Sequence, residues 1–178
     1  MSSFTWRTPG KQDRRLLQTF TCAEGRPPDG RLPFWENEVQ KYFRQDALAD
    51  TNRSAHLGQR FRIAEDASGI VGAYTHARPE SLHPDLRLAP DQACRGLLML
   101  GVATRHRHQG GKVADQVFDD ALYDMAQRES ARKSIVILGH VDRRNVPSQR
   151  MLRRQGFEEV VPGTPAERLG LWMLTLDL

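Results

Sequence analysis

The most regular pattern of apolar and polar positions in the chain lies between residues 112 and 128. Apolar side chains recur there at helical spacing in two neighbouring rows. The first row is Val113, Val117, Ala121 and Met125, and the second is Ala114, Phe118, Leu122 and Ala126. Because residues four apart lie on one face of a helix, the pattern predicts a helix from Lys112 to about Arg128 with that face against a core.

A short and nearly continuous apolar run, SIVILGHV, covers residues 134–141. Strands that are covered on both faces have this composition, so the run predicts a fully buried strand. Further strands are expected over residues 4–9, 56–66, 69–77, 94–104, 157–161 and 169–178. Further helices are expected over residues 13–23, 34–49 and 145–155. Gly101 interrupts one strand, where a glycine often marks a bulge or a close approach.

The order of these elements predicts a mixed α/β (α+β) fold, in which helices cover both faces of a central sheet of about seven strands. A length of 178 residues suffices for one domain with a full core. We therefore expect residues 1–178 to form a single domain.

Composition places the chain among ordinary globular proteins, with 39% apolar and 27% charged residues. The sequence has no run of about 18 apolar residues, so we expect no membrane span. The first residues lack the apolar core of a secretory signal, and two cysteines are too few for a disulfide framework. We therefore expect a cytoplasmic protein in which Cys22 and Cys94 are reduced thiols that pack in the core.

The formal net charge is +4 and the isoelectric point lies near 9.4, which favours an anionic ligand or partner. Many of the basic residues fall in two clusters, namely Arg105, His106, Arg107, His108 and Lys112, and then Arg143, Arg144, Arg150, Arg153 and Arg154. A solvated surface is the ordinary explanation for such clusters. The sequence lacks the interleaved aromatic residues and the zinc-ligand spacing of nucleic-acid binding modules, so nucleic acid is not an expected partner.

Two adjacent glycines, Gly110 and Gly111, stand between the first basic cluster and the helix 112–128. The first turn of a helix has N–H groups without intrahelical partners and a partial positive charge. Phosphate oxygens satisfy both, and glycine lets them approach the backbone closely. The pattern indicates a phosphate site, with a tight turn beside a basic surface as the alternative. It lacks the spacing of a nucleoside-triphosphate loop and of the dinucleotide G-x-G-x-x-G motif.

Two segments carry a resemblance to a known family. The segment LGVATRHRHQGGKVADQV resembles the acetyl-coenzyme A signature of the GNAT N-acetyltransferases, R-x-x-G-x-[GA] after a hydrophobic strand. Arg107 and Gly110 match it, while Lys112 replaces the last glycine or alanine. The segment HVDRRNVPSQRMLRRQGFEEV resembles the second motif of the family, in which Asn145 opens a helix and Gly156 closes it. Its version, N-x-x-S-x-R followed by G-F, is most similar to the ribosomal-protein N-terminal acetyltransferase branch.

The resemblance implies the GNAT fold, in which the fourth and fifth strands splay apart and acetyl-coenzyme A, the co-substrate, lies in the cleft. It implies that a strand backbone bonds the pantetheine amides, that the basic turn wraps the pyrophosphate and that an asparagine reaches the cofactor. The positions implied for cofactor binding are Leu100, Gly101, Val102, Arg107, His108, Gln109, Gly110, Gly111, Lys112 and Asn145. His106 is expected to line the same phosphate mouth.

The resemblance also implies direct transfer of the acetyl group to an amine, helped by a general base and a general acid. His140 stands where relatives place a glutamate base, and a neutral imidazole can accept a proton. A structural, hydrogen-bonded histidine is the alternative. Relatives use a tyrosine acid at the position of Leu152, which cannot donate a proton. Ser148 is the nearest substitute, unless it only bonds the helix backbone. The two cysteines lie outside both motifs and no histidine has metal-ligand spacing, so neither a cysteine nucleophile nor a metal is expected.

These inferences predict an acetyl-coenzyme A-dependent N-acetyltransferase that acts on the amine of a small molecule or of a peptide N-terminus. The alternatives are a toxin-like acetyltransferase of aminoacyl-tRNA and a non-catalytic acyl-coenzyme A sensor or scaffold. The resemblance assigns acceptor selection to residues 34–49 and 78–92. Phe34 and Trp35 either shape the acceptor pocket or pack in the core. Homodimers are common in the family, so a homodimer is one expectation for this chain.

Overall fold

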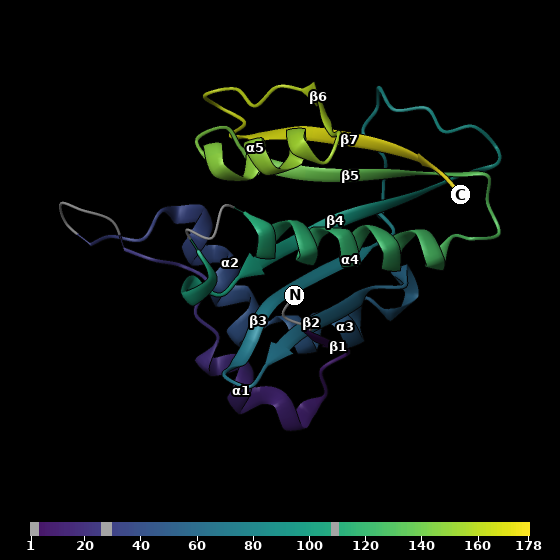
Figure 1. Cartoon of the computed structure of the whole chain (residues 1–178). Coiled ribbons are helices and arrows are strands. Elements are labelled where there is room, and N and C mark those ends of the chain that lie inside the picture. Colours follow the sequence, from purple (N-terminus) through teal and green to yellow (C-terminus); the bar gives the residue numbers. More distant parts are fainter. Residues whose placement is uncertain (1–3, 26–29, 108–110) are drawn as a thin grey trace.

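The computed structural model describes residues 4–25, 30–107 and 111–178. Within them the strands form one mixed sheet in the order β1-β2-β3-β4-β5-β7-β6 (Figure 1). The strands are β1 (Thr5–Arg7), β2 (Arg60–Asp66), β3 (Gly69–Ala77), β4 (Gln92–Val102), β5 (Ser134–Asp142), β6 (Glu158–Val161) and β7 (Leu169–Asp177). The helices are α1 (Arg14–Thr19), α2 (Phe34–Gln45), α3 (Ala47–Arg53), α4 (Lys112–Arg128) and α5 (Val146–Arg154). β4 and β5 are parallel and the other neighbours are antiparallel, which confirms the predicted α/β fold.

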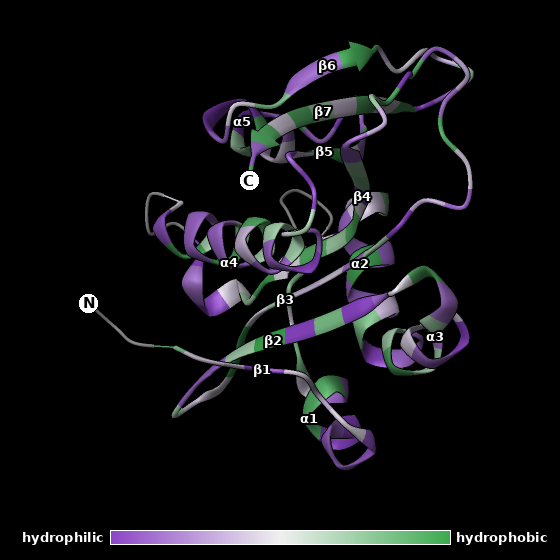
Figure 2. Ribbon diagram, turned by 90° about the vertical axis from the view of Figure 1, so that its right-hand side faces the viewer, coloured by the Kyte–Doolittle hydropathy of each residue, from purple (hydrophilic) through white to green (hydrophobic). Residues whose placement is uncertain are grey.

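Helices cover both faces of the sheet, as predicted (Figure 2). α4 and α5 lie on one face, where their side chains share a core cluster with β3, β5 and β7. α1, α2 and α3 lie on the opposite face, where a second cluster joins them to β2 and β3. We call these the α4 face and the α2 face. On the α2 face, Leu86 and Leu88 of the loop 78–91 cover a third cluster on β4, β5 and β7.

The apolar face of α4 packs against the sheet, as its periodicity predicts. Val113, Val117, Ala121 and Met125 of the first predicted row are all buried. Phe118 is the member of the second row that is fully buried, and its ring meets that of Phe157 edge to face at 5.6 Å. Regular helical spacing therefore identified the buried face of this helix correctly.

β5 has core clusters against both of its faces, which explains its continuous apolar run. Ile135 and Ile137 belong to the cluster on the α4 face. Val136 and Leu138 belong to the cluster beneath the loop 78–91 on the α2 face. The prediction of a strand buried on both faces is confirmed.

The helix expected over residues 13–23 is shorter in the structure and ends at Thr19. Beyond it the chain bonds to α2 instead of continuing the helix. Oε1 of Gln40 accepts the backbone N–H groups of Cys22 and Ala23 at 3.1 and 3.2 Å. A contact between elements thus overrides local helical spacing here.

Further boundaries differ from the prediction. The strand expected over 56–66 begins at Arg60, because Ala55–Leu57 form a 3-10 turn that ends at Gly58 in a left-handed conformation. The helix expected over 34–49 bends at Asp46, and its continuation α3 packs on β2 with Ala47 fully buried. The strand expected over 94–104 is shifted by two residues and spans Gln92–Val102. The chain then turns away from the sheet, and the backbone N–H of Thr104 bonds the carbonyl of Thr21.

Gly101 lies at a close approach of side chains, not at a bulge. A Cβ atom there would lie 3.2 Å from Sγ of Cys22 and 3.2 Å from Cε2 of Phe43. Cys22 and Cys94 are free and buried, as expected. Burial raises the pKa of Cys22 to about 12 and that of Cys94 to about 11, so both thiols are protonated at neutral pH.

Candidate active site

The parallel strands β4 and β5 pair along only part of their length. Their last pair is Leu97 with Gly139. Beyond it β4 continues along β3 to Val102, while β5 continues along β7 to Asp142 (Figure 1). In the described part of the chain, no strand pairs with the edge of β4 that faces this gap over residues 98–102. This geometry confirms the predicted splay of the fourth and fifth strands.

β4 carries one extra residue where the two strands separate. Thr75 pairs with Met99 and His76 pairs with Leu97, so Leu98 is bulged. Side chains of a regular strand alternate between faces, and one extra residue shifts that alternation. As a result Leu97 and Leu100 both pack against the core of the α4 face.

The gap between the strands is open beside Gly139. A Cβ atom added to this buried glycine would meet no other atom within 4 Å. Gly139 and its neighbours Ile137 and Val141 alternate with the side chains of the α2 face, so this space lies on the α4 face. A ligand can therefore approach the free edge of β4 from the side of α4 and α5.

The N-terminus of α4 begins at a glycine in a left-handed conformation. Gly111 is the N-cap residue with φ +81°, a region that favours glycine, and the Lys112 side chain is exposed. Of the positions implied for the phosphates, His108, Gln109 and Gly110 lie outside the described residues. Sequence reasoning did not assign Arg154 to the N-terminus of α4. In the structure its Nη2 lies 3.0 Å from the position that a Cβ atom of residue 111 would occupy.

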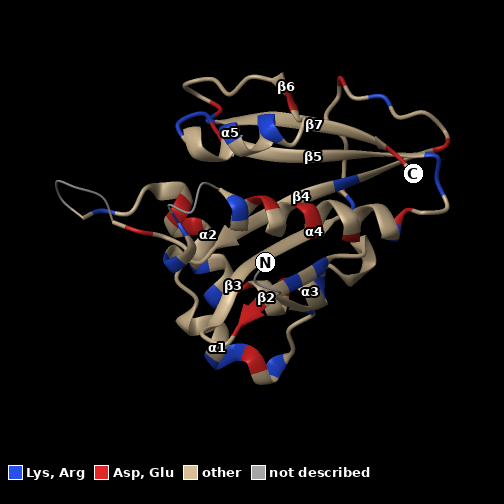
Figure 3. Ribbon diagram, in the orientation of Figure 1, with Lys and Arg blue, Asp and Glu red and all other residues tan. Residues whose placement is uncertain are grey.

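Arg154 joins the two helices of the α4 face. Its Nη2 pairs with Oδ1 of Asp115 in α4 at 2.8 Å. The neighbouring Arg153 places its guanidinium 4.9 Å from the ring centroid of Trp172. Figure 3 shows basic positions in blue on α5 and at the start of α4. Arg153 and Arg154 of the second basic cluster thus lie on the same face as the open gap.

The first basic cluster is divided among several structural contacts. Arg107 pairs with Glu36 of α2 at 3.0 Å and donates to the carbonyl of Cys22. Arg105 and His106 both contact Asp66 in the β2–β3 turn, at 2.9 and 3.1 Å. The hairpin turn thus supplies one partner of His106, and its expected place at the phosphate mouth stays a prediction.

Asn145 caps α5. Its Oδ1 accepts the backbone N–H of Ser148 at 3.3 Å, and Pro147 occupies the first turn. Ser148 is half-buried, whereas Leu152 one turn later is 2% exposed and belongs to the core. The position where relatives carry a tyrosine acid is thus a packing position in this chain.

His140 directly follows the last β4–β5 pair and lies on the α2 face. Its partner in β7 is Leu171, a member of the core cluster on that face. The side chain is exposed, yet the surrounding chain partly withdraws it from water and His83 lies near it. Both effects lower the pKa of His140 below its ordinary value of 6.5, so the imidazole is neutral at neutral pH.

Asp142, two residues further along β5, is engaged by Arg144. Its carboxylate accepts from Nε and Nη2 of Arg144 at 2.9 and 2.7 Å, and these bonds lower its pKa to about 2. The Arg144 guanidinium also lies 5.3 Å from the ring centroid of Trp35 in α2. Phe34 beside it is 60% exposed. Trp35 therefore contacts Arg144 just beyond the end of β5, and Phe34 does not pack in the core.

No family model and no curated protein matches the sequence. Solved structures do match it along nearly its whole length. A protein from Desulfovibrio desulfuricans assigned to the GNAT acetyltransferases is 15% identical, with a TM-score of 0.55 over 98% of this chain and 99% of that one. The PaiA N-acetyltransferase of Thermoplasma acidophilum, in complex with coenzyme A, is 15% identical, with a TM-score of 0.62 over 99% and 100%. The NatC complex bound to a Gag peptide and coenzyme A is 15% identical, with a TM-score of 0.54 over 99% and 99%.

These similarities, together with the splayed strands, show that the chain has the fold of the GNAT acetyltransferases. Among the residues that the structure describes, no helix is long and apolar enough to cross a membrane. The same residues contain no group of three histidine, cysteine, aspartate or glutamate side chains arranged to hold a metal ion.

Proposed function

We propose that this protein is an acetyl-coenzyme A-dependent N-acetyltransferase that transfers the acetyl group directly to the amine of a small molecule or a peptide N-terminus. The observation that carries the proposal is the divergence of β4 and β5 after the pair Leu97–Gly139. It leaves a strand edge free beside the N-terminus of α4, with open space next to Gly139. We also propose that residues 1–178 act as one cytoplasmic domain, which agrees with the two free, buried cysteines.

The residues present fit an acyl-coenzyme A along this edge. Backbone groups of Leu100, Gly101 and Val102 would bond its amides as a neighbouring strand would. Gly111, Lys112 and the N–H groups of the first turn of α4 would hold its phosphates, together with His108, Gln109 and Gly110. Asn145 would contact it from the start of α5. Arg107 would support the turn from the α2 face through Glu36.

When bound, the co-substrate supplies an acetyl thioester that an amine can attack. His140 lies on the opposite face at the same level, so an amine that enters from the α2 face would meet a neutral imidazole able to take its proton. Ser148 would donate the proton that the departing sulfur needs. Asp142 is a weak base at neutral pH, because its pKa is about 2 and Arg144 occupies its carboxylate.

Replacement of Gly111 tests the phosphate site. Aspartate and asparagine both tolerate a left-handed backbone and serve as N-cap residues, so both variants should fold. Gly111→Asp adds a negative charge where the phosphates would lie, and we expect it to weaken coenzyme A binding at least tenfold relative to Gly111→Asn, about 1.4 kcal/mol. Isothermal titration calorimetry on the two variants measures the effect of the charge alone. Equal affinities would remove the phosphate role of this helix terminus.

Turnover separates the proposed enzyme from its alternatives. We expect thiol release from acetyl-coenzyme A on mixing with a panel of small amines and peptides, with acetylated amine as the second product. Coenzyme A binding without transfer to any amine would favour a sensor or scaffold. Salt-sensitive binding of tRNA, with acetylation of its aminoacyl group, would favour the toxin-like reaction.

A further inference from the structure

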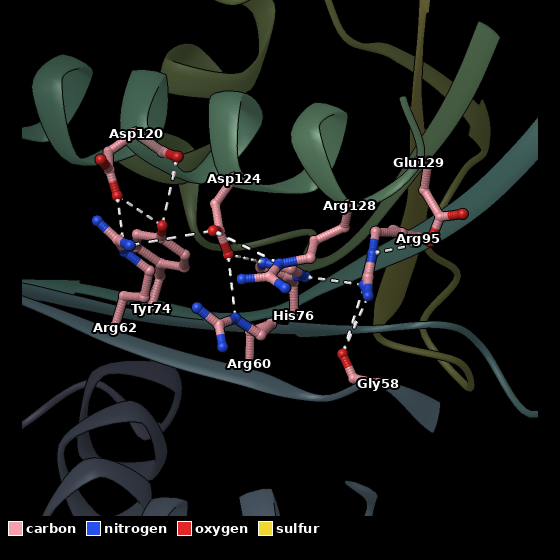
Figure 4. A network of polar contacts seen from close by, with 10 residues as sticks. All are labelled: Gly58, Arg60, Arg62, Tyr74, His76, Arg95, Asp120, Asp124, Arg128 and Glu129. Carbon is pink, nitrogen blue, oxygen red and sulfur yellow. Dashed lines mark hydrogen bonds and ion pairs between the residues drawn. The ribbon is translucent and has the colours of Figure 1, made fainter. Parts of the chain in front are cut away.

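A cluster of polar side chains is buried between α4 and the strands β2, β3 and β4, shown in Figure 4. His76 is completely buried and Arg95 is 2% exposed. The cluster consists of Arg60, Arg62, Tyr74, His76, Arg95, Asp120, Asp124, Arg128 and Glu129, with the carbonyl of Gly58. Burying charged groups costs desolvation energy, and apolar side chains of similar volume often stabilise a core at least as well. Stability alone therefore does not explain the cluster.

His76 is held through both of its ring nitrogens. Its Nε2 lies 2.8 Å from Oδ2 of Asp124, and its Nδ1 lies 3.4 Å from Nη1 of Arg95. A guanidinium can only donate, so Nδ1 is the acceptor and Nε2 carries the proton that it donates to Asp124. Burial lowers the pKa of His76, which agrees with a neutral ring in this tautomer. The imidazole thus links α4 to β4 in one defined orientation.

Arg95 extends this link to both sides. Its Nη2 donates to the carbonyl of Gly58 at 3.0 Å, and its Nε lies 3.5 Å from Oε1 of Glu129 at the end of α4. Glu129 in turn accepts two hydrogen bonds of 3.1 Å from Arg78, whose side chain is 59% exposed. Arg95 is therefore fixed against the α4 face by the chain before β2, by β3 and by α4.

The link ends where β4 and β5 separate. His76 pairs with Leu97, which is also the last residue of β4 to pair with β5. The bulged residue Leu98 comes next. The buried polar contacts thus hold β4 immediately before the edge over residues 98–102 becomes free.

The position of the bulge follows from two requirements on either side of it. Arg95 must point to the α4 face to reach His76 and Glu129. Leu100 must point to the same face to join the core. In a regular strand, residues five apart point to opposite faces, so one extra residue has to lie between these two positions. Without the hold on Arg95, the extra residue could shift along the strand, and different backbone groups would then face the gap.

We propose that His76, Asp124 and Arg95 are positioning residues, which hold β4 in the register that places the bulge at Leu98 and so orient the free edge over residues 98–102 for the acyl donor. The identity of the donor rests on the proposed function. The control of strand register by the three side chains does not depend on it.

Two substitutions of His76 test this inference. His76→Phe fills the space but offers no hydrogen bond to Asp124 or Arg95. His76→Gln keeps one donor and one acceptor. We expect His76→Phe to accelerate amide hydrogen exchange at residues 98–102 at least tenfold and to weaken coenzyme A binding at least tenfold. His76→Gln should stay within about threefold of the wild type in both measurements, since its amide can replace both contacts.

Arg78→Gln is the matched control, because it removes the exposed partner of Glu129 without touching His76. Arg78→Gln should leave both measurements unchanged. Amide exchange in β7 should be unchanged in every variant, when all variants are measured well below their unfolding transitions. Unchanged exchange at residues 98–102 in folded His76→Phe would overturn the proposal, and so would equal acceleration in all strands. If His76→Phe does not fold, Asp124→Asn supplies the same readouts. If the wild type binds no coenzyme A, the proposed function fails, and the exchange data alone decide the register.

Discussion

Replacing Phe118 with alanine is expected to lower the free energy of unfolding by about 3–5 kcal/mol. The ring is 0% exposed, lies at the centre of the buried face of α4 and contacts Phe157 edge to face. Its removal leaves a cavity that the close-packed sheet beneath it cannot fill, because strands on both sides hold the backbone. Urea denaturation measures the change, and thermal unfolding should shift by about 2–4 °C for each kcal/mol in a domain of this size.

Tyr123→Ala on the same helix is the control for this prediction. Tyr123 is 65% exposed, so its truncation should change stability by no more than about 0.5 kcal/mol. A loss below about 1 kcal/mol for Phe118→Ala, or equal losses for both variants, would contradict the assignment of the buried face.

Replacing His140 with glutamine is expected to lower kcat/KM by roughly a hundredfold or more, if the imidazole takes the proton of the acceptor amine. Its pKa is lowered from 6.5, so the base is neutral at neutral pH and is protonated only as the pH falls below that value. The rate of the wild type should therefore hold at neutrality and fall on the acidic side of pH 6.5. Glutamine has no titrating group, so the pH profile of the variant should lose this fall at acidic pH, which is the acidic limb of kcat/KM.

Ser148→Ala separates the roles of acid and base. It should also lower the rate, but it should leave the acidic limb of kcat/KM in place, because His140 remains. Asp142→Asn is a further control, since a carboxylate with a pKa of about 2 cannot produce a limb near neutrality. A wild-type rate and pH profile in His140→Gln would show that the histidine is structural and that the proton leaves by another route.

Local spacing predicted the elements that build the donor side of the site. The period of α4 and the unbroken apolar run of β5 reflect burial of one helix face and of two strand faces, and both are properties of neighbouring residues. Asn145 as the start of a helix and Gly156 just beyond its end were readable for the same reason. The class of fold followed from the order of such elements.

Partners distant in sequence could not be predicted in this way. Arg107 and His106 belong to one basic run, yet one pairs with Glu36 of α2 and the other with Asp66 of the β2–β3 turn. Arg154 reaches the N-terminus of α4 although the chain separates them by a strand and a helix. The sequence shows where the arginines stand in the chain, but the packing of the elements determines which acid or phosphate each one contacts.

The sequence by itself determined α4, the two ends of α5 and most strands, because each depends on neighbours within a few residues. Only the tertiary structure decided that the strand bulges at Leu98 rather than at Gly101 and that β4 leaves β5 after Leu97. Those features follow from which face Arg95 and Leu100 must present to α4. That requirement appears only when β3, β4 and α4 pack together, because the partners of both side chains come from other elements.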